Sequence, residues 1–309
     1  MNRNHYWYIY ILSTVVLILS ACVPGRDNSG SMVENATAMT TTTEDNPLTA
    51  MTATPPIIST DHAPSTPQSE QNSVNGAIIW QATHETGNIS EWQQHGDFIT
   101  QGQSAYFNMV TPFAHSGKYS VSLTIDTEGA SSSGDFAAYL FYWDQLPGDA
   151  YYYSAWYYIP AGTQPQDWWN IWQWKSTYNG NTDDSVPMYS MDVHDLGNGK
   201  MSLKLIYRPD LERNAISHQQ NIKLLPHDQW VHIEAYYQKA TNETGKVIVW
   251  QDGVEIFNLS NVQTTMQDNT VYWSINHYTD NILPNPSSIY IDDAAISTER
   301  IGPDYTLPY

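Results

Sequence analysis

The chain has a single cysteine, Cys22, and few basic side chains. One cysteine cannot form a disulfide within the chain, and no clustered His and Cys spacing indicates a zinc site. The 309 residues contain 12 Lys and Arg against 32 Asp and Glu. Two of these basic and six of these acidic residues precede Ala77, which leaves 10 and 26 and a net charge of −16 from there on. This balance argues against nucleic acid, anionic lipid and highly sulfated polysaccharide as partners of that region.

Helical periodicity is almost absent after residue 76, and apolar and polar residues alternate instead. No internal repeat is visible. We therefore expect one all-β domain over 77–309, an antiparallel β-sandwich of the jelly-roll class, acting as a monomer. The expected strands are 77–82, 118–126, 136–143, 151–159, 170–176, 188–195, 200–208, 230–238, 245–253, 271–278 and 288–297. Asn198-Gly199 and Asp252-Gly253 indicate two hairpin turns between them.

The N-terminus reads as an export signal. The apolar run 9–19 is too short to span a bilayer comfortably, and it is followed by Leu19-Ser20-Ala21-Cys22. That ending resembles a bacterial lipobox, which implies removal of residues 1–21 and lipidation of Cys22. The expected location is extracytoplasmic, anchored by lipid to a bacterial membrane at the cell surface. The alternative is an ordinary signal peptide with an unmodified cysteine.

Residues 22–76 are rich in Ser, Thr, Pro and Asn and have no apolar period. Such a segment cannot bury enough surface to offset its chain entropy, so we expect a disordered tether before the domain.

The segment WWNIWQWKSTY (168–178) has four tryptophans within seven residues. Alternation along a strand places Trp172 and Trp174 on one face, with Ile171, Gln173 and Lys175 on the other. Two tryptophans on one face indicate the core of the sandwich, so we expect Gln173 to be exposed in a groove.

Several segments in this order resemble one group of enzymes. They are YYYSAWYYIP (151–160), WNIWQWK (169–175), WVHIE (230–234), VIVWQDG (247–253) and YWSINHY (272–278). The pattern is similar to that of the jelly-roll polysaccharide lyases of the heparin, alginate and glucuronan lyase type. The resemblance implies a concanavalin A-like sandwich whose concave sheet binds a glycan, and cleavage of a uronate chain by β-elimination.

Those lyases carry Gln-x-His on one strand and Tyr-x-Lys-x-Gly-x-Tyr on another. Gln173 and Tyr278 match these patterns, whereas Lys175 stands in place of the histidine and Ser274 in place of the lysine. The arginine-bearing strand of the alginate lyases has no evident counterpart. The resemblance implies that Tyr278 transfers protons, and a tyrosine with a pKa of about 10 needs a nearby cation to act as a base. We assign that role to Lys175.

Parity adds neighbours to this site. Ser274, Asn276 and Tyr278 share a face, and Asp192 and His194 face outward from 188–195. Gln173, Asn276 and Lys175 would stabilise the developing charge, and His194 would replace the missing base unless it lies on a merely solvated face. Expected substrate contacts are Ser274, Asn276 and Asp192, with Trp168, Trp169 and Tyr178 as sugar-stacking rings.

Two other functions are weighed against the lyase. A retaining glucanase needs two carboxylates about 5–5.5 Å apart, and the usual Glu-x-Asp-x-x-Glu motif is absent. A non-catalytic carbohydrate-binding lipoprotein stays open, because aromatic rings and amides suit a neutral glycan.

The expected chemistry needs no cofactor. A structural Ca²⁺ between the first and last strands is an additional expectation, with Glu85, Asp292 and Asp293 as oxygen ligands. The alternative there is a charged edge and turn.

Overall fold

The computed structural model describes residues 77–308 except 102–104, 128–135, 183–184 and 210–213. The predicted signal peptide, Cys22 and the linker lie outside the described residues. In the described part, no helix is long and apolar enough to cross a membrane.

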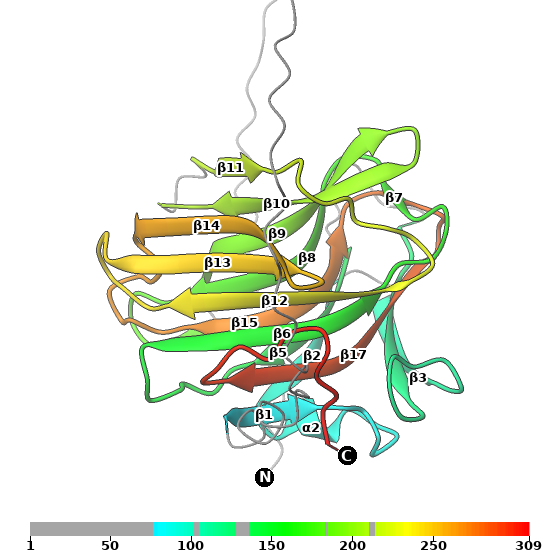
Figure 1. Ribbon diagram of the computed structural model, residues 1–309, viewed down its shortest axis with the longest axis horizontal. Coiled ribbons are helices and arrows are strands. Elements are labelled where there is room, and N and C mark those ends of the chain that lie inside the picture. Colours follow the sequence, from blue (N-terminus) through cyan, green and yellow to red (C-terminus); the bar gives the residue numbers. More distant parts are fainter. Residues whose placement is uncertain (1–76, 102–104, 128–135, 183–184, 210–213, 309) are drawn as a thin grey trace, which may run out of the picture. The chain divides into compact units, whose positions relative to one another are not determined.

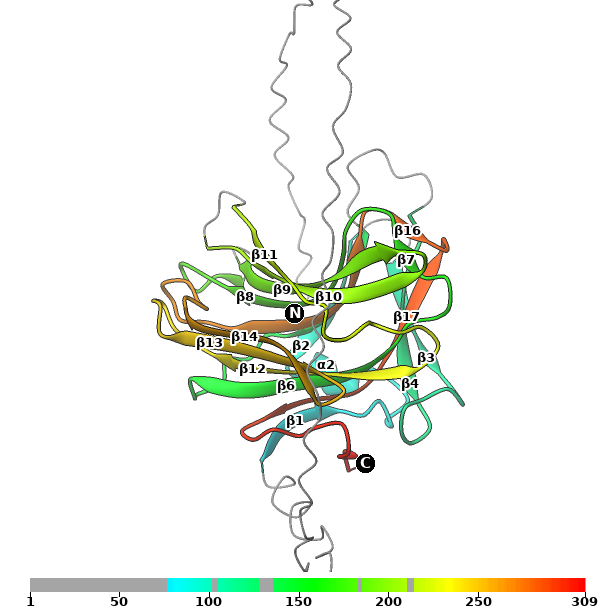
Figure 2. The same cartoon turned by 45° about the horizontal axis from the view of Figure 1, so that its top comes forward.

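Two antiparallel sheets form the domain, and in Figure 2 strands of one sheet lie above strands of the other. The first sheet has eight strands, of which seven run in the order β14 (Val254–Val262), β13 (Gly245–Gln251), β12 (Trp230–Gln238), β6 (Ala150–Tyr158), β17 (Ser287–Ser297), β4 (Ser120–Ile125) and β3 (Ala105–Val110), and β1 (Ile78–Ala82) pairs with β17. The second has seven strands in the order β11 (Ile216–Gln219), β10 (Lys200–Tyr207), β9 (Val186–Gly197), β8 (Trp169–Ser176), β15 (Tyr272–Thr279), β5 (Phe136–Tyr142) and β2 (Gly96–Gln101).

Three short elements complete the domain: the paired strands β16 (Ile282–Leu283) and β7 (Gln164–Pro165), and the helix α2 (Ser90–Gln93). Figure 1 shows how the strands and this helix are arranged. The all-β antiparallel sandwich expected from the sequence is confirmed. Six strands were not expected: β2, β3, β7, β11, β14 and β16. The strand β14 shows one reason, because it lies at a sheet edge and exposes much of its length, so its apolar signal is weak.

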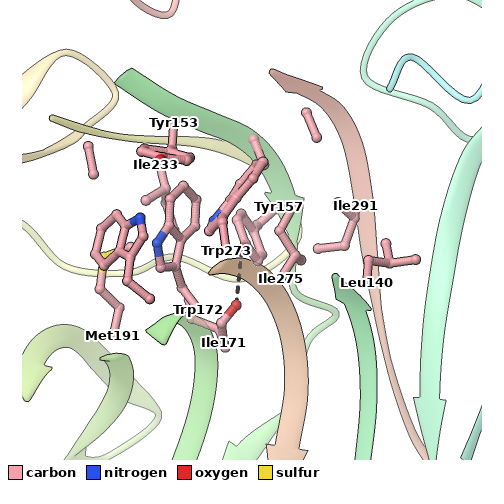
Figure 3. Packing of buried hydrophobic residues seen from close by; sticks show 14 of the residues in the cluster. Leu140, Tyr153, Tyr157, Ile171, Trp172, Met191, Ile233, Trp273, Ile275 and Ile291 are labelled. Atoms are coloured by element: carbon pink, nitrogen blue, oxygen red, sulfur yellow. Dashed lines mark hydrogen bonds between the residues drawn. The ribbon is translucent and has the colours of Figure 1, made fainter. Parts of the chain in front are cut away.

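Aromatic side chains from both sheets fill the core. Trp172 and Trp174 are fully buried, as the alternation predicted, and Trp172 packs against Trp273 with ring centroids 4.9 Å apart. In Figure 3 the rings of Trp172 and Trp273 lie beside Tyr153 and Tyr157 of the opposite sheet. The hydroxyl of Tyr157 donates to the carbonyl of Ile171 at 3.0 Å, so a hydrogen bond ties the two sheets together.

Both predicted hairpin turns are present. Asn198 and Gly199 join β9 to β10 with φ of 54° and 70°, and Asp252 and Gly253 join β13 to β14 with φ of 46° and 77°. Two successive residues with positive φ are what a tight hairpin turn of this hand requires. Asp252 is therefore a turn residue, as the predicted hairpin required.

Candidate functional site

The candidate site lies on the outer face of the seven-stranded sheet. Core side chains of β15, β8 and β9 alternate with polar side chains that point the other way, as parity predicted. We call the following eight residues the polar face: Asn170, Gln173, Ser190, Asp192, Lys204, Ser274, Asn276 and Tyr278.

A β-bulge changes the expected membership of this face. The pairing of β8 with β9 shifts between Asn170 and Trp172, so Ile171 and Trp172 both turn into the core. The prediction that Ile171 shares a face with Gln173 is therefore wrong. Asn170 takes that place, because a bulge reverses the alternation on one side of it.

Cross-strand register orders the polar face into rows. One row runs from Tyr278 on β15 through Asn170 and Asp192 to Lys204 on β10. A second row contains Ser274 and, opposite it, Gln173 and Ser190. Directly opposed residues have Cβ atoms about 4.5–5.5 Å apart, so each row is a line of touching side chains.

A chain of side-chain hydrogen bonds connects the face. Asn276 Nδ2 donates to Asn170 Oδ1 at 2.5 Å, and Asn170 Nδ2 donates to Asp192 Oδ1 at 2.8 Å. Ser190 Oγ donates to the same Asp192 oxygen at 3.3 Å and accepts from Arg208 Nη1 at 2.9 Å. Burial raises the pKa of Asp192, while the amide of Asn170 and the positive charges of Lys204 and Arg208 act in the opposite direction.

Three buried oxygens of the face have no hydrogen-bond partner among the described residues: Gln173 Oε1, Ser274 Oγ and Asn276 Oδ1. Buried polar atoms in native proteins are nearly always paired with protein or ordered water. These three unpaired oxygens lie on the adjacent strands β8 and β15, and they are therefore the atoms that a bound water or a polar ligand would satisfy. Gln173 is only 5 % exposed, so the expectation of an exposed glutamine is wrong.

Lys175 lies away from the predicted proton-transfer group. It is opposite Tyr272, whereas Tyr278 is opposite Asn170, six residues further along β15. At about 3.3 Å per residue the two lie roughly 20 Å apart. Lys175 instead packs over the ring of Phe141, 5.3 Å from its centroid, and burial lowers the pKa of Lys175. The predicted stabilisation of a Tyr278 phenolate by Lys175 is therefore wrong.

Tyr278 itself sits among aromatic rings. It is half-buried, with its ring edge-to-face with Trp168 at 4.6 Å and tilted against Tyr139 at 5.3 Å. Trp168 is half-buried too and lies against Tyr278 of the polar face. Tyr178 is 38 % exposed and lies beyond the other end of β8.

Trp169 belongs to the core and not to a sugar surface, which corrects its predicted role. It is fully buried, and its Nε1 donates to His277 Nδ1 at 3.0 Å. His277 Nε2 in turn donates to the carbonyl of Ser287 at 3.2 Å, in the opposite sheet. Burial lowers the pKa of His277 to about 3, so this imidazole is neutral.

The remaining ionisable groups near the face are His194, Lys204 and Arg208. His194 is half-buried opposite Ser202, two residues beyond Asp192 on the same outward face and about 7 Å from it. Sequence reasoning missed Lys204 and Arg208. Extending the parity argument to 200–208 would have placed both on this face, because Met201, Leu203 and Leu205 point into the core.

The three acids expected to bind Ca²⁺ all bind the segment 115–119. Asp292 Oδ2 accepts from the backbone N–H of His115 at 2.8 Å, Asp293 Oδ2 accepts from Ser116 Oγ at 2.7 Å, and Glu85 Oε1 accepts from the N–H of Tyr119 at 2.8 Å. Asp293 Oδ1 is buried without a partner in the described structure. No group of three or more His, Cys, Asp or Glu in the described ranges could hold a metal ion by itself. A Ca²⁺ here would need main-chain carbonyls or water as further ligands.

Glu234, the isolated acid of the segment 230–234, has a structural partner. It is fully buried and accepts from Arg300 Nε at 3.1 Å and from the N–H of Ile301 at 2.6 Å. Its carboxylate thus fixes the C-terminal segment to β12.

Comparison with known proteins identifies the group to which this architecture is similar. The family model described as polysaccharide lyase matches residues 84–295. An endo-β-1,4-glucuronan lyase from the fungus Trichoderma reesei has a TM-score of 0.54 and 16 % identity over 67 % of this chain and 94 % of its own. An alginate lyase from a Chlorella virus has a TM-score of 0.47 and 14 % identity over 71 % of this chain and 99 % of its own. No curated protein sequence matches significantly.

Proposed function

We propose, because this chain belongs to the polysaccharide lyase family, that its polar face binds a uronate-containing glycan and cleaves it by β-elimination. The observation that carries the proposal is the row from Tyr278 to Lys204. This row places a phenol, an amide, a carboxylate and a cation on one sheet face, which also carries three buried oxygens without partners in the described structure. The glucuronan lyase with the same fold makes glucuronan the first substrate to test.

The reaction has a simple balance. A base removes the proton on the carbon that carries the uronate carboxylate, and the released electron pair forms a carbon–carbon double bond. The glycosidic C–O bond breaks, its electrons stay on the leaving oxygen, and an acid protonates that oxygen. Hydrogen-bond donors must stabilise the charge that develops on the carboxylate.

Tyr278 is the residue to which we assign proton transfer. It is the phenol of the face, and it lies on the row of Asn170 and Asp192 and two residues from Asn276. Gln173 supplies an amide on the adjoining row. Lys204 and Arg208 supply positive charge in a domain that is otherwise strongly acidic, and this suits an anionic uronate. We assign His194 as the second proton-transfer group, in place of the missing base.

The test is the substitution Tyr278→Phe, which removes one oxygen and keeps the packing against Trp168. We expect the rate on glucuronan to fall by roughly 10²–10⁴-fold, measured as the ultraviolet absorbance of the unsaturated product. Tyr106→Phe is the matched control, since Tyr106 is exposed on β3 of the other sheet, and it should retain full activity. Full activity of Tyr278→Phe would refute the assignment, and His194→Gln would then test the alternative base.

Non-catalytic glycan binding is the second candidate, favoured by the half-buried rings of Trp168 and Tyr278 beside the amides. If no uronate polymer is cleaved while a neutral glycan binds, this function replaces the lyase. Trp168→Ala should then abolish binding, because stacking on the sugar ring would be lost.

We also propose lipid anchoring through Cys22, on the Leu-Ser-Ala-Cys motif. Metabolic labelling with a palmitate analogue should be lost in Cys22→Ala. A wild-type protein without label would show that the segment is an ordinary signal.

A structural Ca²⁺ at Glu85, Asp292 and Asp293 is proposed on the buried, unpartnered Asp293 Oδ1. The melting temperature should rise with added Ca²⁺ and fall with EGTA, and Asp293→Asn should remove the difference. A melting temperature independent of Ca²⁺ would leave these acids with their loop-holding role alone.

A further inference from the structure

The buried carboxylate of Asp192 fixes the orientation of two side-chain amides, first that of Asn170 and, through it, that of Asn276. Asp192 Oδ1 accepts from Ser190 Oγ, which itself accepts from the donor-only guanidinium of Arg208, so the amide that binds this oxygen must present its NH₂ group. Asn170 does so, with Nδ2 donating to Asp192 Oδ1 at 2.8 Å. The carbonyl oxygen of Asn170 then points the other way, toward Asn276.

The same argument applies one residue further. Asn170 Oδ1 accepts from Asn276 Nδ2 at 2.5 Å, so the NH₂ group of Asn276 faces Asn170. Asn276 Oδ1 is left buried and without a partner in the described structure. An amide that was expected to donate to the developing charge therefore offers an acceptor instead.

We propose, on the basis of the lyase function above, that Asp192 and Asn170 are positioning residues that turn Asn276 to accept a hydrogen bond from a sugar hydroxyl. The ligand is a uronate chain with a free hydroxyl group at that position. A chain whose hydroxyls are O-acetylated has no donor there and binds more weakly. Asn276 has no exposed surface, so a side chain must rotate to admit the ligand, and the half-buried Tyr278 on the same face is the candidate.

The substitution Asp192→Asn tests the orientation. An asparagine at position 192 can present either end of its amide, so the direction of the chain of amides is no longer fixed. Asp195→Asn is the matched control, because it makes the same chemical change three residues along β9 at an exposed side chain bonded to Gln164.

The first measurement needs no ligand. In protein labelled with ¹⁵N at asparagine, Asp192→Asn should shift the side-chain amide signals of both Asn170 and Asn276, and Asp195→Asn should shift neither. An unchanged Asn276 signal in Asp192→Asn would overturn the proposed relay, whatever the protein binds.

The second measurement uses glucuronan oligosaccharides, deacetylated and O-acetylated, titrated calorimetrically into protein carrying Tyr278→Phe to prevent turnover. The deacetylated form should bind about tenfold more tightly, as one hydrogen bond allows, and adding Asp192→Asn should remove this preference. A preference that persists in Asp192→Asn would overturn the positioning role. Absence of binding by either oligosaccharide would instead refute the uronate-binding function and, with it, the ligand part of this proposal.

Discussion

The buried imidazole of His277 predicts a specific loss of stability in acid. Its pKa is lowered to about 3 by burial, against an ordinary value near 6.5 in the unfolded chain. Between these values the unfolded chain binds a proton that the folded protein does not, so stability is complete above pH 6.5 and falls as the pH drops toward 3. Each pH unit within this window costs about 1.4 kcal/mol.

The magnitude follows directly. From pH 7 to pH 5, His277 passes through about 1.5 units of its window, which costs roughly 2 kcal/mol. His232 is buried with a pKa also lowered to about 3, and it adds a similar amount. We expect the free energy of unfolding to fall by about 4 kcal/mol from these two groups together.

Urea unfolding followed by tryptophan fluorescence at pH 7 and pH 5 measures this loss. In His277→Gln, an amide keeps an acceptor for Trp169 and a donor for the Ser287 carbonyl, so about half of the loss should disappear. Gln219→Asn, an exposed amide change on the edge strand β11, should leave the pH dependence unchanged. If His277→Gln loses as much stability between the two pH values as the wild type, the neutral buried imidazole is refuted.

Two further predictions concern the core and the C-terminal segment. Trp174→Ala should lower the free energy of unfolding by about 3–5 kcal/mol. Gln173→Ala should be nearly neutral, because it removes a buried oxygen that has no partner in the described structure. Equal melting temperatures for the two variants would contradict the assignment of faces. Glu234→Gln should weaken the hydrogen bonds to residues 300–302 by about 1–3 kcal/mol and speed amide exchange there, and unchanged exchange would show that Glu234 does not hold this segment.

Alternation along single strands was enough to predict the fold and the face of Trp172 and Trp174 in β8. Trp172 and Trp174 on one side, and Ser274, Asn276 and Tyr278 on another strand, lie where a period of two places them. The alternation of apolar and polar residues within a strand shows which of its side chains face the core, so the sequence of that strand alone is sufficient.

The geometry of the site depended on register and on a bulge, which no single strand records. Lys175 and Tyr278 face the same side, but the pairing of β8 with β15 puts them at opposite ends. Asn170 joins the face only because the bulge turns both Ile171 and Trp172 inward. Trp169 was expected to be a sugar-stacking ring because nothing in its own strand reveals that it is buried. Its hydrogen-bond partner His277 lies more than a hundred residues away in the sequence.

The most direct test of the central claim is incubation of the purified wild-type domain with glucuronan while the absorbance of unsaturated uronate is followed. The proposed lyase predicts a rise in absorbance with the wild type and with Tyr106→Phe, and almost none with Tyr278→Phe. New reducing ends without unsaturated product, or an equal rise with Tyr278→Phe, would contradict it.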